Sequence, residues 1–180
     1  RVLVLQHPRE RRVPVGTGRM ANLCLPNSRL FVGLDFADHA DLPAELSDPA
    51  RPAALLFPTD AADLAGAPPP GPISLVLLDG TWSQAKKLLQ LNPRIAALPR
   101  YSLAPPPSEY VIRREPSREY VSTLEALAHA LAVLEGDVSC REALLAPFRR
   151  MVAMQLEHRE RLNGGLTRHR KRWAGSENKP

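Results

Sequence analysis

Short runs of apolar residues alternate along the chain with stretches of helical spacing. Four of these runs have the length of strands, and each ends at a polar residue, a glycine or a proline. They span Val2–Leu5, Arg29–Gly33, Ala53–Pro58 and Ile73–Leu78. The last run is apolar at nearly every position, which is typical of a strand that is covered on both faces in a parallel sheet. The alternation of strands and helices therefore predicts an α/β fold.

Helical periodicity is clearest after the fourth run and in the last third of the chain. Ser83–Leu91 places its apolar residues on one side, and Ser122–Gly136 has a continuous apolar stripe that stops at the glycine. Arg141–Leu162 is predicted as a second long amphipathic helix. Its predicted buried residues are Leu144, Leu145, Phe148, Met151, Val152 and Leu156. Three shorter elements are also predicted, namely helices at Thr17–Leu23 and Asp60–Ala65 and a strand at Tyr110–Ile112.

Length and composition indicate one folded domain followed by a tail. The chain has 180 residues, which is within the usual range for a single domain. We predict the domain over residues 1–162 and a basic, flexible tail over residues 163–180. No apolar run approaches the length of about 20 residues that a membrane span requires. Cys24 and Cys140 have no metal-binding spacing, so no metal site is predicted, and a cytoplasmic location is expected.

The positive charge of the chain is concentrated near its carboxyl end. The net charge is +5, and residues 141–172 hold nine Lys and Arg against three Asp and Glu. An arginine-rich segment on a nearly neutral body is typical of proteins that bind phosphate-bearing partners, because contacts with the phosphate backbone dominate the affinity for nucleic acids. A solvated helix face has the same pattern. RNA is the expected partner, neither DNA nor a membrane is expected, and the oligomeric state stays open.

The most informative segment is Asp79-Gly80-Thr81-Trp82, which follows the most apolar run. It lies between a predicted strand and a predicted helix, in the kind of turn where open α/β sheets bind ligands. Asp and Thr also cap the N-termini of helices, and glycine is common in the turn before a helix. By itself, the segment is compatible both with a binding site and with a structural turn.

This segment is part of a longer series of motifs. The upstream members are His7-Pro8-Arg9-Glu10, Thr17-Gly18-Arg19, Asn27-Ser28 and Phe57-Pro58. The downstream members are Ala85, Asn92-Pro93, Tyr110, Arg113 and Ser122-Thr123-Leu124-Glu125-Ala126. In this order they resemble the DTW-domain family of tRNA-uridine aminocarboxypropyltransferases, over about residues 5–156. Family members usually have a cysteine cluster before the His-Pro-x-Glu segment, and the sequence shows none there.

The resemblance implies a fold, a cofactor and a reaction. Because the family is related to the SPOUT class, the resemblance implies a knotted α/β catalytic domain with a mostly parallel central sheet flanked by helices. It also implies transfer of the 3-amino-3-carboxypropyl group of S-adenosylmethionine to N3 of a uridine in tRNA, with release of methylthioadenosine. N3 of uridine is a poor nucleophile while it is protonated, so this attack calls for a base. Asp79 is the candidate, either as that base or as a group that positions the cofactor or the uracil.

Further site residues are assigned from the resemblance and from their positions. The expected cofactor contacts are Pro58, Thr59, Leu78, Gly80, Thr81, Trp82, Leu103, Ser122, Thr123 and Glu125. The expected RNA contacts are Arg19, Lys86, Arg113, Arg114, Arg149 and Arg150. His7 and Glu10 are candidates for a catalytic pair, although a turn with a surface glutamate has the same pattern.

Several of these residues also have structural explanations. Ser122 and Glu125 have the spacing of a capping box, and Thr81 has the position of an N-cap. Trp82 suits the hydrophobic core as well as stacking on uracil or adenine. Two other functions are also compatible with the sequence, namely an S-adenosylmethionine-dependent RNA methyltransferase and a non-catalytic RNA-binding module. The reaction product distinguishes the first, since methyl transfer leaves S-adenosylhomocysteine, and cofactor binding distinguishes the second.

Overall fold

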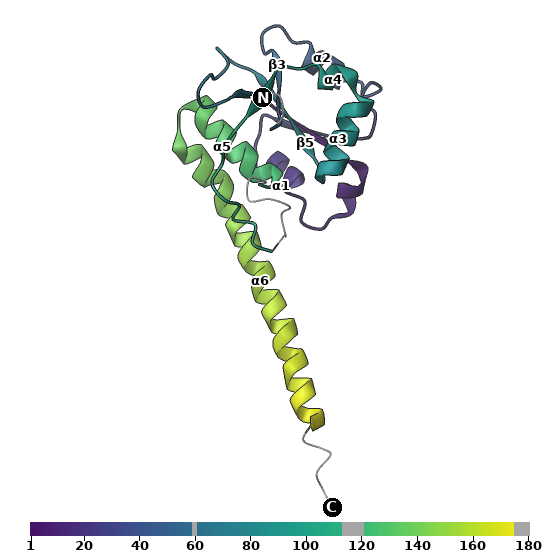
Figure 1. Cartoon of the computed structure of the whole chain (residues 1–180), viewed down its shortest axis with the longest axis vertical. Helices are drawn as coiled ribbons and strands as arrows, with labels where there is room; N and C mark the ends of the chain where they lie inside the picture. The colour runs from purple at the N-terminus through teal and green to yellow at the C-terminus, as the bar shows by residue number, and fades with distance from the viewer. Residues whose placement is uncertain (59–60, 113–120, 175–180) are drawn as a thin grey trace, which may run out of the picture.

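A parallel sheet forms the centre of the protein in the computed structural model, which describes residues 1–58, 61–112 and 121–174, the last twelve by their backbone alone (Figure 1). Its strands are β1 (Val2–Gln6), β2 (Ser28–Val32), β3 (Ala53–Leu56), β4 (Ala62–Asp63), β5 (Ser74–Asp79) and β6 (Arg100–Ser102). Their order in the sheet is β2-β1-β5-β3-β6-β4, and every pairing is parallel. The predicted α/β class with a parallel central sheet is confirmed, and the knot stays a prediction.

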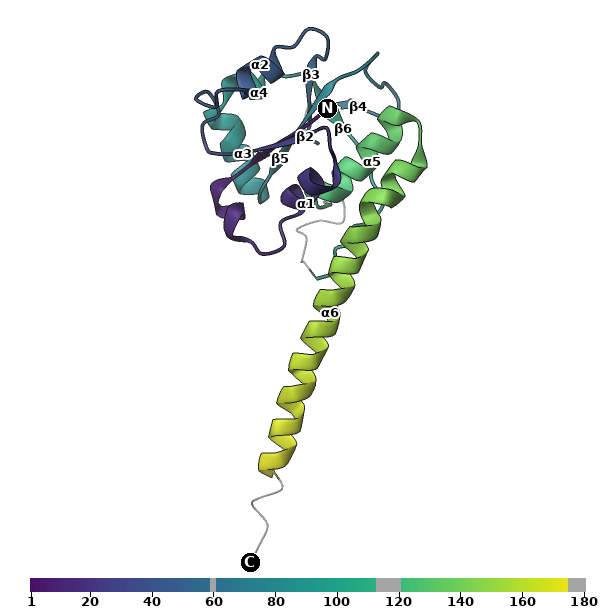
Figure 2. The same cartoon turned by 180° about the vertical axis from the view of Figure 1, so that it is seen from behind.

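Helices cover both faces of the sheet (Figures 1 and 2). One layer consists of α1 (Thr17–Cys24), α5 (Thr123–Glu135) and the first part of α6 (Val138–Ala174). The other layer consists of α2 (Leu42–Leu46), α3 (Trp82–Leu91) and α4 (Pro93–Ala96). A short 3-10 helix, η1 (Pro8–Arg12), follows β1. The predicted helices at Thr17–Leu23 and Ser83–Leu91 are therefore confirmed within a residue at their ends.

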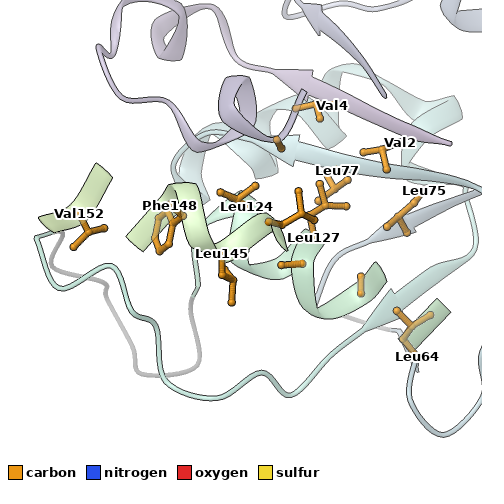
Figure 3. Close-up of a cluster of buried hydrophobic side chains, with 14 residues drawn as sticks. Val2, Val4, Leu64, Leu75, Leu77, Leu124, Leu127, Leu145, Phe148 and Val152 are labelled. Atoms are coloured by element: carbon orange, nitrogen blue, oxygen red, sulfur yellow. The ribbon is translucent and has the colours of Figure 1, made fainter. Parts of the chain in front are cut away.

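The sheet is buried on both faces because its central strands are apolar at consecutive positions. Side chains alternate between the two faces along a strand, so Leu75 and Leu77 of β5 pack toward α5 and α6 while Val76 packs toward α3. Figure 3 shows the first of these two cores, where residues of β1 and β5 meet Leu124 of α5 and Phe148 of α6. The prediction that this apolar run is covered on both faces is confirmed.

The parallel arrangement brings all strand ends to two edges. The carboxyl ends of the strands form one edge, called the carboxyl edge below, and their amino ends form the opposite amino edge. Gln6 at the end of β1 pairs in register with Asp79 at the end of β5. β1 and β5 are neighbours in the sheet, and the connections that follow them run in opposite directions. The connection after β1 leads to β2 on one side, and the connection after β5 leads to β6 on the other. Such a divergence of connections is where open α/β sheets bind ligands.

Three short segments differ from what periodicity predicts. Residues 61–65, predicted as part of a helix, contain β4 instead, and the backbone N–H of Leu64 donates to the carbonyl oxygen of Ser102 in β6 (2.9 Å). The strand β6 itself is not predicted. Tyr110–Ile112, predicted as a strand, forms a turn in which the Tyr110 N–H donates to Oγ of Ser108. In each place, hydrogen bonds that periodicity does not reveal decide the local structure.

Helix α6 begins against α5 and runs well past the folded body (Figures 1 and 2). The predicted burial is confirmed for Leu144, Leu145, Phe148 and Val152, and Met151 is half-buried. Leu156 is 36% exposed, so its predicted burial is wrong, because the helix has left the other layers at this point. The backbone of residues 163–174 continues the helix, and the flexible tail over residues 163–180 stays a prediction. Within the described ranges, no helix combines the length and the apolar character needed to cross a membrane.

Candidate active site at the carboxyl edge

A pocket opens at the carboxyl edge, between the ends of β3, β5 and β6 and the N-terminus of α5. Its walls are mostly apolar, with Phe57, Leu78 and Tyr101 among them. The polar side chains in its lining include Ser122 and Thr123, at the start of α5. Apolar walls with a few convergent polar groups are typical of sites for small molecules and cofactors.

Most of the predicted cofactor contacts line this pocket. The predicted contacts found in its lining are Pro58, Leu78, Gly80, Trp82, Leu103, Ser122 and Thr123. Thr81 and Glu125 do not line it, and Thr59 lies outside the described residues. The indole of Trp82 has both of the expected environments. It belongs to the core beside Phe57, at 5.6 Å between ring centroids, and it also faces the pocket.

Asp79 is buried next to the pocket and does not line it. Its side chain is 4% exposed, and both carboxylate oxygens accept hydrogen bonds. Nε2 of Gln6 donates to Oδ2 (2.8 Å), and Oγ1 of Thr123 donates to Oδ1 (2.7 Å). Because Thr123 is part of the pocket wall, it connects the carboxylate to the pocket. Oε1 of Gln6 is buried and has no hydrogen-bond partner in the described residues.

The carboxylate of Asp79 also lies against the first turn of α1. A Cβ atom at Gly18 would lie 2.3 Å from Cγ of Asp79 and within 2.6 Å of both oxygens. Real Cβ atoms essentially never make contacts this short, so the backbone can approach the carboxylate only because residue 18 is glycine. The positive end of the helix dipole favours a negative charge at this position.

The residues after Asp79 form the start of α3. The Oγ1 of Thr81 accepts a hydrogen bond from the Gln84 N–H (3.4 Å), and Oε1 of Gln84 accepts one from the Thr81 N–H (2.7 Å). This reciprocal capping box confirms the structural explanation of Thr81. Gly80 lies close to the first turn of α3 and to His7, since a Cβ atom there would be 2.8 Å from Oε1 of Gln84 and 3.4 Å from Cβ of His7.

A second capping box begins α5. Oγ of Ser122 accepts from the Glu125 N–H (3.3 Å), and Oε2 of Glu125 accepts from the Ser122 N–H (2.8 Å). Glu125 is 2% exposed and also accepts hydrogen bonds from Oγ of Ser108 and from the Glu109 N–H. Glu125 therefore binds the loop before α5 to the helix behind the pocket wall.

The sequence of the chain matches a known protein family. Residues 1–156 match the DTW domain. The chain belongs to the DTW-domain family. It is 36% identical to tRNA-uridine aminocarboxypropyltransferase 2 of Drosophila melanogaster over 165 residues, which cover 87% of this chain and 65% of that protein. Proteins of the same name from Macaca fascicularis and Mus musculus are 32% and 33% identical, with 86% of this chain and 54% of each relative covered.

The chain therefore spans between about half and two thirds of the length of these curated relatives. No solved structure matches the chain. The turn at Asp79-Gly80-Thr81-Trp82 lies within the matched residues, and its Gly80 and Trp82 line the pocket.

Of the predicted pair His7 and Glu10, His7 lies beside this turn. His7 is 9% exposed, its N–H donates to the carbonyl oxygen of Asp79 (2.9 Å), and its Nδ1 accepts from the Arg9 N–H (3.2 Å). His7 thus caps η1 and binds β1 to the end of β5. The Glu10 N–H donates to the carbonyl oxygen of His7 (3.0 Å), and within the described part of the chain no hydrogen bond joins the two side chains. Their assignment as a catalytic pair stays a prediction.

The predicted RNA contacts are distributed unevenly over the DTW domain. Arg113 and Arg114 lie outside the described residues. Arg149 forms ion pairs with Glu109 and Glu142, and these raise the pKa of its guanidinium above the ordinary value. The side chain of Arg150 is 69% exposed and lies 3.9 Å from a carboxylate oxygen of Glu157. The two remaining contacts are an exposed lysine on α3 and a half-buried arginine on α1, Lys86 and Arg19.

Some residues of the site are absent from the sequence-based assignment. Gln6 ends an apolar run as Asp79 does, and this shared pattern was the available signal. Phe57 and Gly18 belong to the series of family motifs without a role assigned to them. Tyr101 and Ser102 reach the pocket through β6, the strand that periodicity does not predict, so no local signal marks them.

Proposed function

We propose that this DTW-domain protein transfers the 3-amino-3-carboxypropyl group from S-adenosylmethionine to N3 of a uridine in tRNA and releases methylthioadenosine. The observation that supports this most directly is the pocket at the carboxyl edge, with the Asp79-Gly80-Thr81-Trp82 turn beside it. The curated relatives are named for this transfer to tRNA uridine. The expected location in the cytoplasm stays a prediction.

The pocket has the chemistry to hold S-adenosylmethionine. Trp82, Phe57 and Leu78 offer apolar and aromatic surface for an adenine ring. At the other side, the N-terminus of α5 has backbone N–H groups and the hydroxyl of Ser122, which suit the carboxylate of a methionine moiety. When bound, the cofactor supplies a sulfonium whose neighbouring carbon accepts the nucleophile.

The position of Asp79 favours one of its two candidate roles. A base must lie within hydrogen-bond reach of the proton that it accepts. Asp79 is buried, and both of its oxygens are occupied by Gln6 and Thr123. We therefore infer that Asp79 is a positioning residue, which holds the Thr123 hydroxyl against the pocket. This arrangement prepares the wall of the site before the reactants arrive.

The reaction is tested with labelled S-adenosylmethionine and unmodified tRNA. Nucleoside mass analysis should show uridine that has gained the aminocarboxypropyl group, and the cofactor product should be methylthioadenosine. Formation of S-adenosylhomocysteine and a methylated nucleoside would assign the protein as a methyltransferase instead. A protein that binds tRNA and has no affinity for the cofactor would be a binding module.

The cofactor site is tested separately with a Ser122→Ala and Thr123→Ala double variant. Loss of the N-cap destabilises a helix by about 1 kcal/mol, and loss of the hydroxyls should also weaken cofactor binding by about tenfold. Asp137→Ala is a matched control at the amino edge, because the Asp137 carboxylate accepts from the Ser139 N–H in the first turn of α6. The control should bind the cofactor as tightly as the wild type. Wild-type affinity in the double variant would exclude these hydroxyls from the site.

A further inference from the structure

The segment that follows β1 has an excess of positive charge. Residues 7–19 contain four arginines, at 9, 11, 12 and 19, and one acidic residue, Glu10. The first three arginines are exposed, and the fourth is half-buried, with its Nη2 donating to the carbonyl oxygen of Arg11 (2.8 Å). In the described part of the chain, none of the four forms an ion pair. The charge of this segment is therefore largely uncompensated.

The same segment lies at the carboxyl edge, next to the pocket. The arginines of η1 follow His7, whose N–H binds the carbonyl oxygen of Asp79 and whose Cβ approaches Gly80. Arg19 follows Gly18, which packs on the Asp79 carboxylate. Gly80 itself lines the pocket. Both views show the purple segment after β1 at the edge of the sheet where α1 and α3 begin (Figures 1 and 2).

We propose that Arg9, Arg11, Arg12 and Arg19, called the η1 arginine surface below, dock the phosphate backbone of the RNA substrate beside the pocket. Exposed guanidinium groups bind phosphate oxygens through paired hydrogen bonds. An RNA whose uridine is extruded into the pocket must bring its neighbouring phosphates to the rim of that pocket. This assignment rests on the proposed function and adds the surface that holds the substrate.

The arginines of α6 are less suited to this task near the pocket. Arg149 is already neutralised by Glu109 and Glu142, so a phosphate would have to displace two carboxylates. The η1 arginine surface has no such competitors among the described residues, apart from the neighbouring Glu10. Charge complementarity therefore favours a polyanion at η1 over one at Arg149.

The test measures binding of unmodified tRNA to an Arg9→Ala, Arg11→Ala and Arg12→Ala triple variant at several salt concentrations. Affinity should fall by about tenfold or more, and the dependence of log affinity on log salt should become shallower by about one unit for each arginine–phosphate pair that the substitutions remove. Affinity for S-adenosylmethionine should be unchanged, which also shows that the variant is folded. If the triple variant fails to bind the cofactor, single arginine variants are measured, each with a loss of about twofold to fivefold expected.

The matched control removes three arginines from the amino edge through Arg51→Ala, Arg94→Ala and Arg141→Ala. Both triple variants change the net charge equally, so a long-range effect of charge would weaken both to the same extent. The docking surface requires a clearly larger loss at η1, and equal losses or no loss would overturn it. A triple Arg→Lys variant of the same η1 positions should recover most of the salt dependence, since the charges are restored.

Failure of the surface and failure of the proposed reaction give different results. Wild-type tRNA affinity in the η1 triple variant, together with modified uridine in the product, would reject the surface and retain the reaction. Loss of tRNA affinity in that variant, together with a wild type that makes no modified uridine, would retain the surface and reject the reaction. An acidic protein as the true partner would appear as unchanged binding of tRNA.

Discussion

Arginines at the two edges of the sheet differ in whether they form ion pairs. At the amino edge, Arg29 forms ion pairs with Asp41 and Glu45, and Arg51 pairs with Asp48. At the carboxyl edge, the η1 arginine surface has no ion pairs within the described residues. Arg29 and Arg51 are thus neutralised at the amino edge, whereas, among the described residues, the four arginines of the η1 arginine surface are not.

This difference indicates which edge is built for a partner. Exposed ion pairs contribute about 0–1 kcal/mol each, so those at the amino edge mainly hold loops in place. Unpaired arginines that are close together repel one another, which destabilises the free protein until an anion binds. The carboxyl edge also contains a buried carboxylate and Oε1 of Gln6, which has no hydrogen-bond partner among the residues that the structure describes. Such costs without a structural gain are typical of functional sites.

The largest effect is expected from Asp79→Asn. The amide would present an N–H group to one of the two donors, Gln6 or Thr123, so the buried network loses a hydrogen bond and Thr123 loses its fixed position. Transfer to tRNA should fall by about a hundredfold or more, while cofactor binding stays largely intact. Asp48→Asn at the amino edge is the matched control and should retain wild-type transfer. Unchanged turnover in Asp79→Asn would remove this residue from the mechanism.

The next effect is expected from Gly18→Ala, which alters no polar group. The added methyl must displace the Asp79 carboxylate or α1, so the free energy of unfolding should fall by about 1–3 kcal/mol and transfer should fall with it. Urea denaturation and the transfer assay measure the two effects. Gly16→Ala in the same segment is the control, because a Cβ atom there meets nothing closer than 3.9 Å and changes only the N-cap of α1. Full activity in Gly18→Ala would show that the close contact has no role in the site.

The smallest effect is expected from Glu109→Gln. This substitution removes one of the two carboxylates that pair with Arg149, and Glu142 remains. The hydrogen bonds from Arg149 hold the pKa of Glu109 below its ordinary value of 4.5. The ion pair therefore stabilises the folded state at pH values above the ordinary pKa of Glu109. This stabilisation is lost as the pH falls through the lower pKa that Glu109 has in the folded state. Because both side chains are substantially exposed, the difference from wild type at pH 7 should be about 0.5 kcal/mol.

Urea denaturation of wild type and Glu109→Gln at pH 7 and at strongly acidic pH measures this difference. The two proteins should become equally stable at acidic pH. A difference that persists there would assign the contribution of Glu109 to packing and not to its charge.

Much of the site follows from local sequence. The spacing of Ser122 to Glu125 predicts a capping box and the position of Thr81 predicts an N-cap, and both begin helices at the pocket. A capping box needs only residues three positions apart, so the sequence contains all of its information. The sequence also predicts the apolar run that becomes β5 and the position of Asp79 at the carboxyl end of that strand.

What the sequence by itself determined is the strands β1, β2, β3 and β5, the helices α1, α3, α5 and α6, the caps of α3 and α5, and the membership of the DTW-domain family. Only the tertiary structure decided that Asp79 is held by Gln6 and Thr123, which are 73 and 44 positions away from it. It also decided that β4 and β6 exist, because strands of two or three residues are stable only when distant segments supply their hydrogen bonds. Local periodicity depends only on residues that are close along the chain. The hydrogen-bond partners of a buried polar group are instead the groups that folding brings within about 3 Å of it.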